Sequence, residues 1–136
     1  MARTFSGTVS NWAKQNEARL TAVFRDACQQ VANDVRVPIS EGGHMPVLTG
    51  NLRRSLTAST TEMPQTRDST TKYDRDVQGN VILTIAKAKL DDTIYLGFQA
   101  NYAPIQEQKH KFVALTAQRW PQILRASAAK IRKAMR

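Results

Sequence analysis

The middle of the chain reads Pro46-Val47-Leu48-Thr49-Gly50-Asn51-Leu52-Arg53-Arg54-Ser55-Leu56. Pro46 has no backbone N–H and favours an extended entry into the segment. Thr49 can accept a hydrogen bond from a first-turn amide and so cap a helix that begins at the next residue. Leu52 and Leu56 are four residues apart, which places them on one face of that helix. The stretch therefore predicts a short amphipathic helix over residues 50–56, at a junction that defines the fold.

Before this run, apolar residues recur at steps of three and four, which is the period of a helix with one buried face. They are Val9, Trp12, Ala13, Leu20, Val23, Phe24, Ala27, Val31 and Val35. Pro38 stops such a helix, because proline disfavours the helical conformation in the residue before it. A long helix from Val9 to Val35 is therefore expected.

After the central run, residues 81–86 and 93–98 are two short segments rich in β-branched and aromatic residues, with a polar turn at 89–92 between them. This pattern predicts an antiparallel hairpin in which Val81, Leu83 and Ile85 share one face. Residues 55–60 are compatible with a further strand. Together these segments predict a sheet of at least three strands, which a helix must cover to be stable.

Three further segments complete the expected organisation of the chain. Residues 101–108 predict a short helix or turn, and the apolar repeat from Phe112 to Met135 predicts a last helix that is kinked or broken at Pro121. The hydroxyl-rich residues 62–78 lack apolar periodicity and predict a long mobile loop.

The fold class that follows is α+β. We expect a long N-terminal helix and a kinked C-terminal helix packed on a small antiparallel β-sheet, with the long mobile loop outside it. The length of 136 residues fits one domain over 1–136.

The net charge of +9 comes almost entirely from the C-terminal end. Residues 109–136 contain eight Lys or Arg and no Asp or Glu, whereas residues 1–108 contain 12 basic and 11 acidic residues, a net of +1. The candidate contact residues there are Arg119, Arg125, Lys130, Arg132, Lys133 and Arg136. Such a basic helix can contact DNA phosphates, dock onto an acidic protein ring, or be a solvated face that suits the negative end of the helix dipole.

Residues for catalysis or metal binding are scarce. His44 and His110 lie in separate polar segments without Cys, Asp or Glu at the spacing of a metal site, and Cys28 follows the apolar period of the first helix, which indicates a buried structural thiol. We expect no enzyme activity, no cofactor and no metal. A single cysteine excludes an internal disulfide and suits a reducing cytoplasm. No apolar run approaches the length of a membrane span or of a signal peptide.

The pattern Pro-Val-x-Thr-Gly-x-Leu-Arg-x-Ser, following a long amphipathic helix, resembles the tail-component or neck proteins of long-tailed bacteriophages, also called tail-completion or head-tail joining proteins. The residues that carry it are Pro46, Val47, Thr49, Gly50, Leu52, Arg53 and Ser55. The Tyr102-Ala103 pair and the apolar-periodic C-terminal helix add to the resemblance.

The resemblance implies a structural virion protein without catalysis. Copies would form a ring, with six as the expected number, in the phage neck. The ring would join the tail tube or tail terminator protein to the head-tail connector and let genome DNA pass, after assembly in the host cytoplasm. The alternative is a small basic module that binds DNA without sequence specificity. An enzyme such as a nuclease or peptidase is the class that the residues support least.

Overall fold

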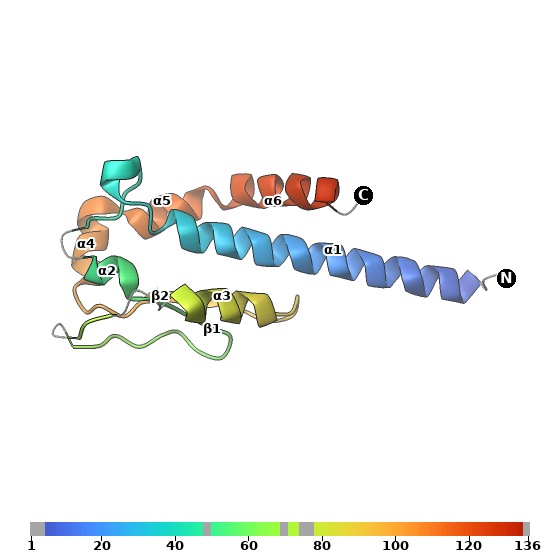
Figure 1. Cartoon of the computed structure of the whole chain (residues 1–136), viewed down its shortest axis with the longest axis horizontal. Coiled ribbons are helices and arrows are strands. Elements are labelled where there is room, and N and C mark those ends of the chain that lie inside the picture. The colour runs from blue at the N-terminus through green and yellow to red at the C-terminus, as the bar shows by residue number, and fades with distance from the viewer. Residues whose placement is uncertain (1–4, 48–49, 69–70, 74–77, 135–136) are drawn as a thin grey trace.

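The computed structural model describes residues 5–47, 50–68, 71–73 and 78–134. Its first element is α1, a helix of 30 residues from Phe5 to Asp34 (Figure 1). The elements that follow are η1 (Ile39–Glu41), α2 (Asn51–Arg54), β1 (Leu56–Ser59), α3 (Gln78–Lys87), β2 (Tyr95–Phe98), α4 (Ala103–His110), α5 (Phe112–Gln118) and α6 (Trp120–Ala134). The expected α+β class is confirmed.

The long first helix and the last helix lie side by side and run in opposite directions (Figure 1). Two ion pairs fix their register, one between Arg119 and Asp34 and one between Lys130 and Asp26. The expected helix over residues 9–35 is confirmed, and it begins four residues earlier than predicted. After α1 the chain turns through a buried Pro38, which forms an isolated bridge with Met45.

The sheet consists of β1 and β2, which pair antiparallel from Leu56 opposite Phe98 to Ser59 opposite Tyr95. Both segments were expected as strands, although the observed strands are shorter. Leu56 is 2% exposed and belongs to the core that the sheet shares with the C-terminal part of α1.

The predicted strand at 81–86 is wrong, because these residues belong to α3, and the described residues therefore form a sheet of two strands and no hairpin of 81–86 with 93–98. Val81, Ile85 and Ala88 are buried at spacings of four and three, which is a helical period. α3 packs against β1 and α1, and the side-chain oxygen of Asn80 accepts the backbone N–H of Ala58 at 2.9 Å. Burial against these elements outweighs the strand propensity of the β-branched residues.

The two faces of α3 give a direct test of this correction. Ile85→Asp buries a charge and is expected to lower the free energy of unfolding by about 3 kcal/mol or more, whereas Leu83→Asp, at a side chain that is 58% exposed, is expected to change it by less than about 0.5 kcal/mol. Urea denaturation measures both. Equal losses for the two variants would support a strand with both residues on one face and contradict the helix.

The central run folds as a junction, with a shorter helix than predicted. α2 covers only Asn51–Arg54, and Leu56 already belongs to β1. Thr49, the expected cap, lies outside the described residues, and the N-cap position is Gly50, whose φ of 82° is left-handed and favours glycine. Leu52 and Leu56 are both buried, but they do not share a helix face as predicted, because Leu56 belongs to the strand.

The C-terminal helix is broken rather than smoothly kinked. α5 ends at Gln118, and α6 begins at Trp120, so that Pro121 lies in the first turn of α6, where its missing N–H costs no helical hydrogen bond. A short helix near 101–108 is confirmed as α4. Within the expected loop over 62–78, the described residues 62–68 and 71–73 contain no helix or strand beyond a single bridge from Arg67 to Ala100, whereas Gln78 already belongs to α3.

Candidate assembly surfaces

The N-terminal half of α1 extends past the ends of α3 and α6, and no other described element lies alongside it (Figure 1). Residues 5–20 make up a segment of about 24 Å. Its apolar side chains are in water, with Val9 46%, Trp12 65% and Leu20 58% exposed. We refer to Val9, Trp12 and Leu20 as the ridge.

Two residues of the ridge continue the apolar side of the same helix. Val9 and Leu20 are eleven residues apart, close to three turns, and lie in line with the buried Ala27 and with Val31, which is half-buried in the wall of a cavity. The sequence predicted one apolar face along the whole helix, and the structure covers only its C-terminal half. Single exposed apolar residues are ordinary, but a row with an exposed Trp on a protruding helix is typical of a contact surface.

An apolar groove lies between α1, α5 and β2. It consists of two cavities of about 340 and 610 Å³ that share Val31, Leu96 and Ala117 in their walls. Further wall residues are Phe24, Cys28, Val35, Ile94, Phe98, Phe112, Val113 and Trp120. The ridge is therefore not the only uncovered apolar surface of the described chain.

The two carboxylates at the groove have structural partners. The Glu107 carboxylate accepts the backbone N–H groups of Val113 and Ala114 at 2.9 and 3.0 Å and so caps the N-terminus of α5. The Asp92 carboxylate accepts the N–H of Lys89 at 2.8 Å. Both groups therefore stabilise the walls of the groove.

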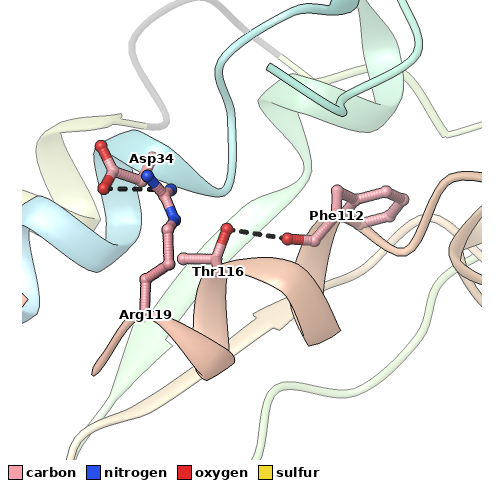
Figure 2. A network of polar contacts seen from close by, with 4 residues as sticks. All are labelled: Asp34, Phe112, Thr116 and Arg119. Carbon is pink, nitrogen blue, oxygen red and sulfur yellow. Dashed lines mark hydrogen bonds and ion pairs between the residues drawn. The ribbon is translucent and has the colours of Figure 1, made fainter. Parts of the chain in front are cut away.

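Two polar contacts lie at the break between α5 and α6, one within α5 and one that reaches the end of α1 (Figure 2). The Thr116 hydroxyl donates to the Phe112 carbonyl at 2.8 Å, and the Arg119 guanidinium lies 3.3 Å from the Asp34 carboxylate. Exposed ion pairs of this kind contribute at most about 1 kcal/mol, so their main effect is on register.

The six basic residues predicted as contacts do not act as one group. Arg119 and Lys130 pair with acids of α1. Burial would raise the pKa of Asp26, but the hydrogen bond and charge of Lys130, together with the Ser127 side chain, outweigh it and lower that pKa. Arg136 lies outside the described residues.

The remaining three form a basic outer face of α6. All three are exposed, and none of them forms an ion pair with a described residue. Arg125 and Arg132 lie on the side away from the buried Ile123 and Ser127, and Lys133 lies at the edge of that side. These three side chains are therefore free to meet an anionic surface.

Two residues of the assembly motif are internal. Leu52 and Ser55 are buried, and the Ser55 hydroxyl donates to the Leu52 carbonyl at 2.7 Å. Pro46 is half-buried and Val47 is 48% exposed, so the entry to the motif reaches the surface.

Asn51, which the motif leaves unspecified, holds the segment 71–73 in place. Its side chain donates to the Thr71 carbonyl and accepts the Tyr73 N–H, each at 3.0 Å. No local pattern pointed to this role, because the partners of Asn51 are about twenty residues away in an irregular segment.

The described residues contain no group of three or more His, Cys, Asp or Glu that could hold a metal ion. His44 is exposed, His110 is half-buried, and Cys28 is buried in the groove wall, where burial raises the pKa of its thiol to about 11. At neutral pH the thiol is therefore protonated, which makes it a weak nucleophile. None of the described helices combines the length and the apolar character needed to span a membrane.

Comparison of the chain with protein-family models, with curated proteins and with solved structures finds no match.

Proposed function

We propose that this protein is a structural component of a tailed-phage virion. Its copies form a ring in the neck that joins the tail tube to the head connector and lets genome DNA pass. The observation that carries the assembly role is the ridge on the protruding half of α1, in a chain that also has an open apolar groove. The assignment to a phage neck is supported by the motif in residues 46–55.

The ridge and the groove lie on different parts of the molecule, which supports a head-to-tail contact. A copy that places its ridge in the groove of a neighbour keeps its own groove open for the next copy. Such a heterologous contact continues until the series closes into a ring. Six copies is the number expected from a sixfold tail tube.

The buried area explains why closure matters. Half of the lateral surface of ~24 Å of helix is ~400 Å², so one ridge-in-groove contact buries ~800 Å² over both partners. Stable interfaces usually bury at least about 1,200 Å², and a single pair is therefore weak. In a closed ring every copy both gives and receives a ridge, whereas a symmetric ridge-to-ridge dimer leaves every groove in water. The area thus favours rings over dimers.

The direct test is sedimentation velocity and negative-stain microscopy of the purified protein over a range of concentrations. Closed rings in equilibrium with monomer are expected, with few dimers between them. A strict monomer at every concentration, which also fails to join tails, would remove the proposal.

Non-specific DNA binding is the second candidate function, and the basic outer face of α6 favours it. Changing Arg125, Arg132 and Lys133 together to Gln is expected to weaken duplex binding and to reduce the slope of log affinity against log salt by about 3, because three phosphate contacts are lost. A salt titration measures this slope.

The matched control for this triple variant removes the same charge elsewhere, by changing the exposed Lys72, Lys87 and Lys89 to Gln. If the control reduces the slope as much as the α6 variant does, net charge and not this face determines the binding.

A further inference from the structure

The smaller cavity of the groove has apolar walls with a single charged group. Its volume is about 340 Å³, and its walls come from several elements, with Val35 of α1, Phe98 of β2 and Phe112 of α5 among them. Of the described residues that line it, Glu107 alone is charged, although the chain contains 20 Lys and Arg. A group bound here must therefore be apolar over most of its surface and must suit one carboxylate.

The Glu107 carboxylate is fixed in place and can still accept further hydrogen bonds. Each of its oxygens accepts one backbone N–H at the start of α5, from Val113 at 2.9 Å and from Ala114 at 3.0 Å. Because each carboxylate oxygen has two acceptor sites, another donor can join without displacing these contacts. An ammonium or guanidinium group would lose its water against the apolar walls, whereas a neutral N–H loses much less. The cavity thus favours an apolar ring that carries one neutral donor.

One wall of this cavity comes from the irregular segment 62–67, which we call the strap. Met63 and Pro64 of the strap line the cavity. Pro64 lies on Gly97 of β2, where an added Cβ would be only 3.3 Å from the proline Cδ, so the glycine permits this close approach. Met63 is 55% exposed although it lines the cavity. Its flexible thioether side chain can cover a flat ring in the cavity, and contacts between sulfur and aromatic rings are favourable.

We propose that this cavity is a binding site for an indole side chain and that its occupant is Trp12 of a neighbouring copy. The indole ring fills the apolar cavity, its N–H donates to the Glu107 carboxylate, and Met63 covers its outer face. The occupant rests on the proposed ring, whereas the indole site itself does not.

The choice of Trp12 follows from exposure and from distance. Of the aromatic side chains whose exposure the structure describes, two are exposed, Trp12 and Trp120, and Trp120 belongs to the wall of the other cavity. Trp12 and the wall residue Val31 lie in one continuous helix, 19 residues apart, which corresponds to a rise of ~28 Å. The Trp12 side chain therefore cannot reach the cavity of its own chain, and only another copy can place it there.

The site is tested with free indole as the probe, on the full chain below the concentration at which rings form. The methyl NMR signal of Met63 is expected to shift and to saturate. Indene has the shape of indole but lacks the N–H, so the ratio of the two affinities reports the hydrogen bond. In Glu107→Gln this ratio is expected to fall by about threefold to tenfold, which corresponds to one hydrogen bond. Unchanged binding of indene in this variant shows that the cavity persists.

A variant that fills the cavity supplies the second measurement. Ala117 is an exposed residue of the wall, and Ala117→Phe is expected to abolish the binding of both probes. Ala86→Phe adds the same ring at an exposed position of α3 outside both cavities and is expected to keep binding. The absence of a saturable shift in the wild type, undiminished binding in Ala117→Phe, or an unchanged ratio in Glu107→Gln overturns the indole site.

The occupant is then tested on assembled rings. Saturating indole is expected to disperse them. Trp12→Phe keeps an aromatic ring without the N–H and is expected to weaken assembly, and Glu107→Gln is expected to add no further loss in that variant. Indole that binds the monomer but leaves the rings intact would show that Trp12 does not occupy the cavity. Indole binding by a chain that never forms rings would refute the ring and the occupant, while the indole site stands.

Discussion

Trp12→Asp combined with Leu20→Asp is expected to abolish ring assembly and to leave the free energy of unfolding within about 0.5 kcal/mol of the wild type. Trp12 and Leu20 are 65% and 58% exposed, so the fold of one copy does not depend on them. In a ridge-in-groove contact Trp12 lies near the middle of the segment, where an aromatic anchor carries much of the binding energy, and Leu20 lies at its C-terminal end. Sedimentation velocity measures assembly, and urea denaturation measures stability.

The matched control carries the same two negative charges on another face of the same helical segment. Asn11→Asp with Gln15→Asp changes two exposed polar residues outside the ridge. This variant is expected to form rings. Rings in the ridge variant, or loss of rings in both variants, would mean that the ridge is not the contact.

Phe112→Ala is expected to lower the free energy of unfolding by about 3–5 kcal/mol. Phe112 is 1% exposed, and its ring lies edge-on to that of Phe98, with centroids 5.2 Å apart and an interplanar angle of 85°. The side chain joins α5 to the sheet, and its removal leaves a cavity that the fixed start of α5 cannot fill. Denaturant unfolding followed by circular dichroism measures the loss.

The neighbouring residue, Val113, provides a matched comparison for Phe112→Ala. Val113 is 45% exposed on the rim of the groove, and Val113→Ala is expected to cost less than about 1 kcal/mol. A cost below about 1 kcal/mol for Phe112→Ala as well would show that α5 does not close the core in the way described.

The elements with a clear period could be predicted from the sequence. The helical repeat predicted α1. Alternation and composition predicted the two strands at 56–59 and 95–98, and Pro121 marked the break before α6. The α3 segment could not be recognised from β-branched content, because burial against β1 decided its conformation. The spacing of Val81, Ile85 and Ala88 was the signal for a helix.

The candidate surfaces were harder to predict from the sequence than the helices and strands. Helical periodicity shows which face of α1 is apolar. How much of that face is covered by other elements depends on where α3 and α6 end. Likewise, nothing local distinguishes Arg36 from a solvated arginine at a helix end, and only the fold buries it to 5% exposure. The cluster of C-terminal charges was visible, but its division between ion pairs and a free face depends on the register of α6 against α1.

Head-to-tail association is tested most directly by adding a tagged Trp12→Asp/Leu20→Asp variant to wild-type protein in increasing amounts and counting rings by microscopy. The variant still has an intact groove, so it accepts a ridge but offers none, and each copy that joins ends the growing series. We therefore expect rings to disappear more steeply than dilution of the wild type explains. Rings that fall only in proportion to the wild-type fraction and contain none of the tagged variant would contradict assembly through a ridge and a groove.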